Sequence, residues 1–498
     1  MGRPYHQIAF SRVFKHTGFL KGIGSSLRLI PLYLGMIALG AALARYSDSP
    51  LLVILFLGAL TLVSFAALDY ALYILLGFLP FSFRFKMLSA TEMQVPTEPL
   101  LAAMTVALFL RWIIMARREG HIRFPFRIPF LLYAVSLFLS IINAGNRYAA
   151  AKGSLRAMAY MMLAIVVFNV VTDRRRLKWL FVTAIVPATV AVVWTVIFLA
   201  DRLDIWMSTR AYEGLLFTSY VHYGAFVAVI LLILLARSIF DRGKYDRVAW
   251  ITLLGIFFIG ICFSFSRGVW VSFIAAAGFM ILQKSTGVQH KRILLIGGGI
   301  ALFLVLLSLP AVSGVIISRI RTMMSLGYGS NKARLFRWGA AITMFWRHPI
   351  IGSGYGSFAH TFVNDPLLQG SYVSKFGMGA HNKYLQTLAE TGLVGFSAWM
   401  WIIISFFRYG FGLLRKLSTL EIEKPNPDSR ISFYRSLVIG TMAAATSMLV
   451  NFLAATMIQS DIIGVPFWLL IGLLPAIGNI AEQEIQKTRE PLSAQTPG

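Results

Sequence analysis

The sequence is poor in cysteine and in acidic residues. Its one cysteine, Cys262, lies inside an apolar run, so the chain cannot form an internal disulfide, and thiol redox chemistry is set aside. Only 20 of the 498 residues are Asp or Glu, against 46 Lys and Arg, which gives a formal net charge of +26. A basic chain of this kind would be compatible with nucleic-acid binding. The position of the basic residues along the sequence decides between this function and a role in membrane topology.

Apolar runs dominate the chain. Hydrophobic residues make up 57% of it, the mean hydropathy is +0.72, and many runs are long enough to cross a ~30 Å hydrocarbon core. The sequence therefore predicts an all-α polytopic membrane protein with about twelve to fourteen spans, the lower counts applying if two short helices are re-entrant. The predicted spans cover residues 28–45, 51–66, 69–82, 98–116, 128–144, 155–172, 177–200, 221–240, 248–265, 269–284, 291–311, 386–408, 433–455 and 461–480.

The basic residues indicate the direction of the spans. Alternate loops carry an excess of Lys and Arg, which places these loops and the N-terminus on the cytoplasmic side. Because the charges fix topology, we do not expect nucleic-acid binding. The loops contain Arg117, Arg118, Arg123 and Arg127; Arg174, Arg175, Arg176 and Lys178; Arg237, Arg242, Lys244 and Arg247; Lys284, Lys291 and Arg292; and Arg415, Lys416, Lys424, Arg430 and Arg435.

The same pattern divides the chain into five regions. Residues 1–27 interleave basic and apolar side chains, which favours an amphipathic segment on the cytoplasmic membrane surface over a cleavable signal peptide. Helices 1–11 occupy residues 28–311, helices 12–14 occupy 386–482, and 483–498 form a cytoplasmic tail. The remaining segment, 312–385, is one large loop of about 70 residues, too long for the positive-inside rule to govern, and we place it on the outer face.

This outer loop is strongly basic and has one acid, Asp365. The imbalance predicts an anionic substrate that binds beside the membrane. The basic residues are Arg319, Arg321, Lys332, Arg334, Arg337, Arg347, Lys375 and, just beyond the loop's polar part, Lys383.

Two more arginines fall on the predicted outer side. Arg210 lies in the outer loop before residue 221, and Arg267 lies in a Ser-Arg-Gly turn. One continuous helix over 248–283 would be ~54 Å long, so a break near Arg267 is required, which places Arg267 at the outer membrane boundary. Its guanidinium is suited to a substrate anion or, alternatively, to lipid headgroups.

Residues 331–348 are predicted to form a helix near the membrane. Its spacing puts Arg334, Arg337 and Ala341 on one face, and Phe336, Trp338, Phe345 and Trp346 provide apolar contact. Two guanidiniums on one face suit a diphosphate, because their forked geometry matches phosphate oxygens. Attachment of the helix to lipid headgroups is the alternative.

The next segment, 348–358, is rich in glycine. It lacks the lysine and the strand context of a nucleotide-binding P-loop, so we interpret it as a structural turn.

His381 follows at the predicted outer end of the next span. A neutral imidazole there can accept a proton from a sugar hydroxyl near pH 7, as a general base does, although a polar surface residue is the alternative. His222 is a weaker candidate, and His348 and His360 are interpreted as structural. The outer acids Asp365, Glu213 and Asp461 are scattered, so we expect metal-independent chemistry without a cofactor.

Several of these features together resemble the O-antigen ligase and polymerase superfamily. They are Ser266-Arg267-Gly268, Arg334 with Trp338, the glycine-rich turn 348–358, and His381-Asn382 followed by Leu388-Ala389-Glu390-Thr391-Gly392-Leu393-Val394-Gly395. The resemblance covers roughly residues 210–395. Where relatives often have an Asn-Pro-Asn-like stretch after the first arginine, this chain departs from the pattern and has Thr218-Ser219-Tyr220.

The resemblance implies a glycosyltransferase of GT-C-like type in the bacterial cytoplasmic (inner) membrane, with its active site facing the periplasm. It would move a glycan from an undecaprenyl-diphosphate carrier to an acceptor hydroxyl. His381 would be the base, Arg210, Arg267 and Arg334 would hold the diphosphate, and Arg337 and His222 are weaker substrate-binding candidates.

The acceptor is left open by the sequence. A polymerase would extend one lipid-linked O-antigen or exopolysaccharide chain with another, in some systems with a chain-length regulator protein, whereas a ligase would deliver the glycan to lipid A core or to protein. The length of the chain favours a polymerase. A polysaccharide flippase is a further alternative, but the repeated halves and mid-membrane charges typical of transporters are not evident. A peptidoglycan polymerase would be expected to use an acidic residue where this chain has His381.

Overall fold

The structure is a computed structural model that describes residues 50–87, 91–116, 124–200, 217, 219–241, 247–283, 329–364, 379–422 and 429–493. Arg210, the predicted spans 28–45 and 291–311, and the amphipathic segment 1–27 lie outside these residues. The described chain forms two compact units, Met1–Pro125, Met162–Ala188 and Gly478–Gly498 in the first and Phe126–Met161 and Thr189–Ile477 in the second.

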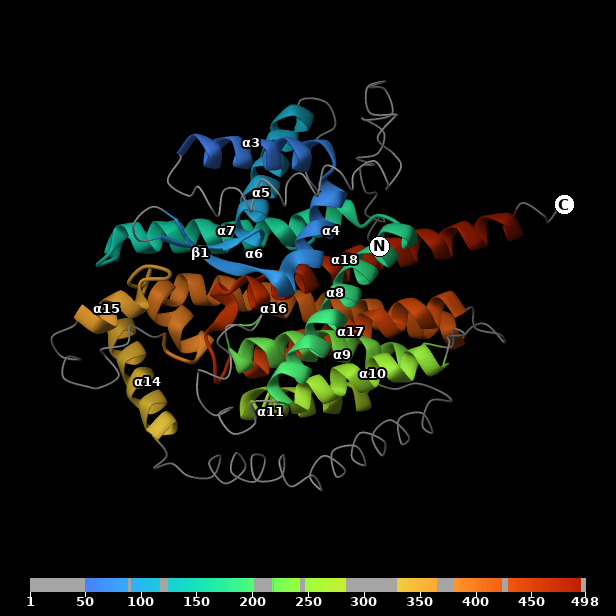
Figure 1. Ribbon diagram of the computed structural model, residues 1–498. Helices are drawn as coiled ribbons and strands as arrows, with labels where there is room; N and C mark the ends of the chain where they lie inside the picture. Colours follow the sequence, from blue (N-terminus) through green and yellow to red (C-terminus); the bar gives the residue numbers. More distant parts are fainter. Residues whose placement is uncertain are drawn as a thin grey trace. The chain divides into compact units, whose positions relative to one another are not determined.

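The second unit is entirely helical in its described part and holds every described candidate residue. Figure 1 shows its elements, of which α7, α8 and α18 continue into the first unit. They are α6 (Arg127–Leu139), η4 (Ser140–Asn143), α7 (Arg147–Val170), α8 (Arg174–Ala200), α9 (Tyr220–Phe240), α10 (Arg247–Cys262), α11 (Arg267–Ile281), α14 (Gly329–Arg347), α15 (Phe358–Asn364), α16 (Lys383–Ile422), α17 (Ser429–Asn451), η7 (Met457–Gln459) and α18 (Asp461–Ser493).

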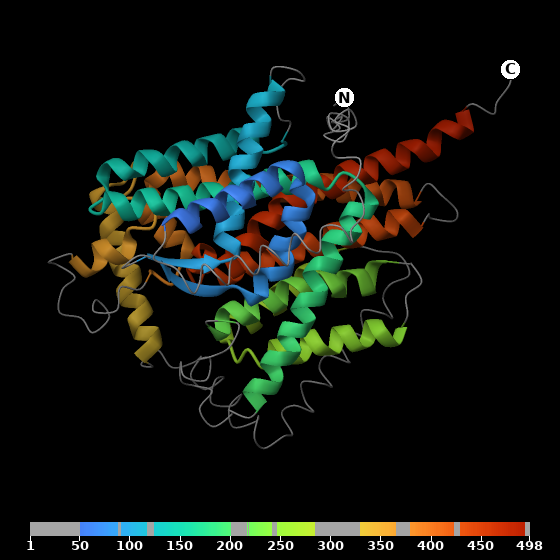
Figure 2. The same cartoon turned by 45° about the horizontal axis from the view of Figure 1, so that its top comes forward.

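Helices α9, α10, α11 and α17 form the packed centre of this unit. They lie side by side in both views (Figures 1 and 2), and small residues allow the close approach. A Cβ at Gly440 of α17 would lie 3.0 Å from Ile233 Cα of α9, so the two backbones nearly touch. This close contact joins the middle of α17 to the middle of α9.

The first unit contains α3 (Pro50–Ala66), α4 (Leu68–Phe78), η2 (Leu79–Phe81), α5 (Thr97–Ala116) and a hairpin of β1 (Phe83–Met87) and β2 (Thr91–Val95). The strands are antiparallel, with Phe83 opposite Val95. The hairpin was not predicted, although the alternation of apolar and basic residues over 83–87 is typical of a strand. Residues 58–66 and 68–81 are bent by 120° relative to each other, so they form either a broken span or the predicted re-entrant pair.

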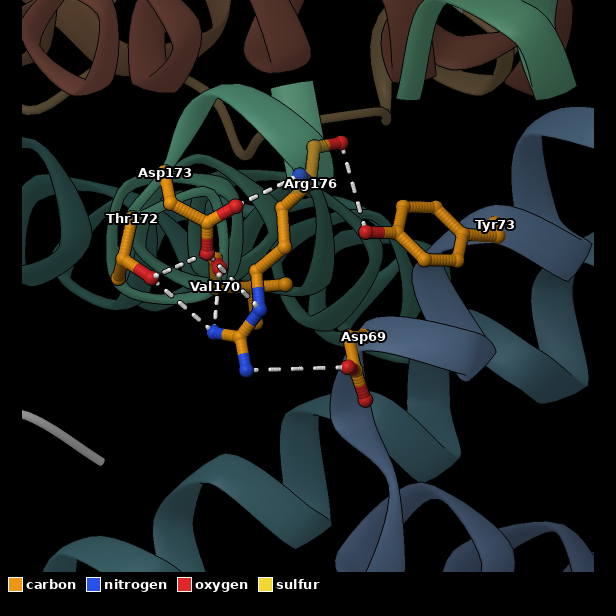
Figure 3. Close-up of polar contacts among 6 residues, drawn as sticks. All are labelled: Asp69, Tyr73, Val170, Thr172, Asp173 and Arg176. Carbon is orange, nitrogen blue, oxygen red and sulfur yellow. Dashed lines mark hydrogen bonds and ion pairs between the residues drawn. The ribbon is translucent and has the colours of Figure 1, made fainter. Parts of the chain in front are cut away.

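An ionic cluster fixes the start of α4 to the turn between α7 and α8 (Figure 3). Arg176 approaches Asp69 at 4.0 Å and Asp173 at 3.6 Å, and its Nη1 donates to the carbonyl of Val170 at 3.0 Å. The Tyr73 hydroxyl donates to the Arg176 carbonyl at 3.4 Å. Both turns are predicted to be cytoplasmic, so this contact agrees with the predicted alternation of loops.

The described helices confirm the predicted all-α membrane fold. Seven of them are long and apolar enough to span a membrane, or up to eight if the bent pair is one span, and three more are shorter apolar helices. Every predicted span within the described residues coincides with a helix, although α16 ends at Ile422, 14 residues beyond the predicted end at 408. Helix α18 continues to Ser493, beyond the end at residue 482 that the sequence predicted.

Candidate functional site

Four connections that the sequence places on the outer side meet at one end of the second unit. Asn143, just after α6, donates to the Gly352 carbonyl at 3.2 Å. Nearby, Arg156 of α7 donates to the Gln459 carbonyl at 3.5 Å. The amide of Lys383 donates to the Phe452 carbonyl at 2.8 Å. The α6–α7 turn, the glycine-rich turn, the start of α16 and the α17–α18 connection therefore form one assembly.

The break before Arg267 is present in the structure. Helix α10 ends at Cys262 and α11 begins at Arg267, so Arg267 is the first residue of a helix. Phe265, in the turn between them, is fully buried and has a positive φ of 47°. A bulky residue in this left-handed region is strained, and surrounding structure must hold it there. The backbone of this turn is consequently constrained just before Arg267, where α11 begins.

Helix α14 confirms the predicted helix over 331–348 and carries both loop arginines. Arg337 is 7% exposed and lies on the face that packs inward, whereas Arg334 is half-buried. The inward face joins an apolar cluster with α15 and α16. Figure 2 shows α14 beside one end of α16. The cluster is made of Ala340, Ala341, Met344, Phe358, Phe362, Ala380 and Ala389, with Leu385 packed against it.

The glycine-rich turn packs against a break in α16. The helix is interrupted at Gly392, whose φ of 61° and ψ of −166° are not helical. Backbone amides of Ser353 and Gly354 donate to α16 carbonyls at 3.0 Å each, and the Leu393 amide donates to the Pro349 carbonyl at 2.8 Å. Cβ atoms at Gly352 or Gly392 would collide with the opposite backbone. The glycines therefore serve a tight backbone contact, in agreement with the structural interpretation of the turn.

His381 occupies the turn immediately before α16. Its φ is 52°, again in the left-handed region, and its side chain is half-buried. Asn382 caps the helix, because its Oδ1 accepts a hydrogen bond from the Leu385 amide at 3.1 Å. The imidazole is thus placed at a helix start, as the sequence predicted, and is held there on a constrained backbone.

Electrostatics connect His381 to the arginines of α14. Burial, together with the charges of Arg337 and Arg334, lowers the pKa of His381 to about 4. Burial and the neighbouring charge of Arg267 lower the pKa of Arg334, and burial and Arg334 do the same to Arg337. Arg334 and Arg337 are therefore close enough to His381 to disfavour its positive charge, and Arg267 is close enough to Arg334 to do the same there. A bound anion would relieve this repulsion.

The structure thus gathers His381, Arg267, Arg334 and Arg337 at one end of the second unit. His222 lies in the first turn of α9, whose Tyr220 also influences the charge of Arg334. Tyr220 was not among the predicted site residues. A group of arginines around a neutral imidazole can hold a diphosphate and remove a proton from a hydroxyl beside it.

Residues 250–400 match the O-antigen ligase family. The matched segment belongs to the O-antigen ligase and polymerase superfamily. It contains α10, α11, α14 and α15 and the first half of α16, and thus Arg267, Arg334, Arg337 and His381. No curated protein is similar enough to the chain to count as a match. The match supports O-antigen ligase or polymerase activity, a transferase role in polysaccharide biosynthesis, and lipid-linked glycans as substrates for this multi-pass membrane protein.

Several buried polar residues at the start of α16 and in the glycine-rich turn were not predicted to be functional. Glu390 and Gln386 are 0% and 4% exposed, Lys383 is 1% exposed, and Tyr355 is also buried. Lys383 Nζ lies 4.8 Å from the centre of the Tyr355 ring. A signal was available in the sequence, since Gln386 and Glu390 stand four residues apart in an otherwise apolar helix and so share a face.

Proposed function

We propose that this protein is a membrane glycosyltransferase that moves a glycan from an undecaprenyl-diphosphate carrier to an acceptor hydroxyl at the outer face of the bacterial inner membrane. The observation that carries the proposal is the meeting of His381 with Arg334, Arg337 and Arg267 at the end of the unit where the predicted outer turns converge. The family match supports the same class of activity.

The mechanism follows from the charges. A neutral imidazole of His381 removes the proton of the acceptor hydroxyl, whose oxygen then attacks the anomeric carbon of the donor glycan. The bond from that carbon to the diphosphate oxygen breaks, and the lipid diphosphate leaves with the electron pair. Arg267, Arg334 and Arg337 stabilise the negative charge that develops on it, and Arg210 is proposed to join them. A single displacement of this kind inverts the anomeric configuration, without a metal or other cofactor.

Polymerisation and ligation use the same site and differ in the acceptor. The protein's length of 498 residues favours polymerisation of O-antigen or exopolysaccharide repeats, whereas the description of the matched family as a ligase favours ligation. In a ligase the acceptor would be lipid A core or protein. Transport of the lipid-linked glycan is less well supported, because the charges cluster at the ends of the predicted spans rather than at mid-membrane depth.

The test is glycan transfer by purified protein in nanodiscs that contain a lipid-diphosphate-linked glycan, with EDTA present. Wild type is expected to form product and release lipid diphosphate. His381→Ala is expected to lose at least about 100-fold in rate, since general base catalysis contributes factors of that order, while it still binds donor.

A His348→Ala variant is the matched control, because His348 is interpreted as structural and should retain transfer. Full activity of His381→Ala would remove His381 from the mechanism. Absence of transfer by wild type, with movement of the lipid between leaflets, would replace the enzyme by a transporter. The acceptor that is consumed separates polymerase from ligase.

A further inference from the structure

A buried chain of side-chain hydrogen bonds leads from the glycine-rich turn to His381. The amide of Ala380, directly before His381, donates to Gln386 Oε1 at 3.1 Å. Gln386 Nε2 donates to Glu390 Oε1 at 2.9 Å, and the same oxygen accepts from the Phe358 amide at 3.2 Å. Gln386 and Glu390 are almost completely buried, so these bonds do not compete with bulk water.

His381 needs such support, because its left-handed backbone is disfavoured for a residue with a Cβ. Downstream of it, the amide of Lys383 is bonded to the Phe452 carbonyl at 2.8 Å. Upstream, the bond from Ala380 to Gln386 fixes the preceding peptide. Loss of the upstream bond would let the turn relax and would carry the imidazole away from its present place.

The charge of Glu390 is balanced locally. Lys383 is buried beside it, attracts it electrostatically and rests over the Tyr355 ring. Among the described residues, Lys383 Nζ has no hydrogen-bond partner. Removal of Glu390 alone would leave a buried, unpaired ammonium group, so any substitution of Glu390 has to be matched by one of Lys383.

We propose that Gln386 and Glu390 are positioning residues that hold the His381 turn in its active conformation and thereby act on glycan transfer through His381. The inference rests on the proposed function and deepens it. Neither side chain touches substrate, since both are buried under the turn.

Gln386→Met tests this chain of hydrogen bonds, because methionine has a similar length and no hydrogen-bonding amide. We expect the kcat of glycan transfer to fall about 100-fold, as for an ångström-scale misplacement of a catalytic group, while donor binding changes little. In a His381→Ala background the same substitution is expected to have almost no further effect, since residues that act as one unit are not additive.

Glu390 is tested with a double variant, Glu390→Leu with Lys383→Met, which removes both charges together. This variant breaks the chain of hydrogen bonds and is expected to lose activity as Gln386→Met does. In Glu390→Gln with Lys383→Met, the amide oxygen can still accept both hydrogen bonds, so the activity should be rescued relative to the leucine pair. Thr391→Val is the control on the same helix, because the Thr391 hydroxyl donates to the Thr387 carbonyl of its own helix at 2.7 Å and, in the described part of the chain, makes no hydrogen bond to Gln386 or Glu390.

Three results would overturn the inference. Unchanged kcat in Gln386→Met is one, full additivity with His381→Ala is a second, and a parallel loss of folded protein and donor binding with normal turnover per folded molecule is the third. Failure of the proposed function is seen separately, because wild type would then transfer no glycan at all.

Discussion

Two non-glycine residues of the described chain have a positive φ, and each lies in a turn that carries a candidate site residue. Phe265 lies two residues before Arg267, and the other residue is His381 itself. Such conformations cost on the order of 1–3 kcal/mol each, and they persist where packing or hydrogen bonds enforce them. Strain at these two positions therefore supports a functional role for both turns.

The low pKa of His381 predicts a characteristic pH dependence. In the free enzyme the imidazole stays neutral down to about pH 4, so the acid limb of kcat/KM should lie near that value. Bound diphosphate offsets the charges of Arg334 and Arg337, which raises the pKa of His381 in the complex. The acid limb of kcat is therefore expected at higher pH than that of kcat/KM. Coincident limbs in a pH–rate profile would contradict this assignment.

The same group affects stability. The pKa of His381 in the folded protein, about 4, lies below the ordinary value of 6.5. Between these values the unfolded chain binds a proton that the folded chain does not, so the free energy of unfolding decreases as the pH falls from 6.5 to 4.

Arg337→Gln should raise the pKa of His381 and move the acid limb of kcat/KM to higher pH, whereas Arg347→Gln at the exposed end of α14 should not.

Gly392 is predicted to be intolerant of a side chain. Its φ is positive, and a Cβ would collide with the carbonyl of Ile350, so Gly392→Ala should destabilise the protein by about 2 kcal/mol or more. Gly412→Ala on the same helix is the control, because a Cβ there meets no atom within 4 Å. We expect thermal unfolding in detergent to show a lower Tm for Gly392→Ala and an unchanged or higher Tm for Gly412→Ala.

At the scale of the element, α14 has two apolar faces. One packs inward through Ala340, Ala341 and Met344, while Leu335 and Trp346 on the opposite face are 55% and 72% exposed. Exposed apolar side chains opposite a packed face fit a helix that lies in the membrane interface. The arginines of α14 would then be held at the level of lipid phosphates and of the donor's diphosphate.

This arrangement predicts selective fluorescence quenching. In vesicles of brominated phospholipid, Trp346 should be quenched, so Trp346→Phe should reduce the quenched fraction of the total emission. Trp338→Phe should reduce it less, because Trp338 is half-buried and its indole nitrogen is shielded. A quenched fraction that falls in neither variant would place α14 away from the bilayer.

Element positions were largely predictable, whereas the links between them were not. Spans such as 221–240 follow from hydrophobic length, and 331–348 follows from helical spacing, because both signals are local. The break at Gly392 is compensated by a turn about 40 residues earlier in the chain, and no local pattern reveals such a pairing. The proximity of His381 to Arg334 and Arg337 was likewise implied by family resemblance and not by spacing.

At the scale of the whole molecule, the contacts among connections test the predicted topology. The α6–α7 turn, the glycine-rich turn and the α17–α18 connection were assigned to one membrane side from charge alone, and within the second unit they meet. Their meeting supports the alternation of spans. Which side faces outward stays a prediction.

Cysteine labelling would decide the orientation, since the chain has one cysteine and Cys262 is buried. In a Cys262→Ala background, Leu453→Cys lies in an exposed position of the α17–α18 connection and should react with an impermeant maleimide in intact spheroplasts. Lys178→Cys, on the predicted cytoplasmic side, should react only after the membrane is opened. The reverse pattern would place the candidate site in the cytoplasm.

The break in α16 also bears on how the protein is made. A span that is interrupted at Gly392 exposes backbone amides and carbonyls, and hydrocarbon offers them no partners. Residues 349–354 supply those partners, and they are synthesised before α16. We therefore expect stable insertion of α16 to depend on residues 349–354 having folded against it, so a defect in this turn should lower the amount of chain that is integrated in the membrane.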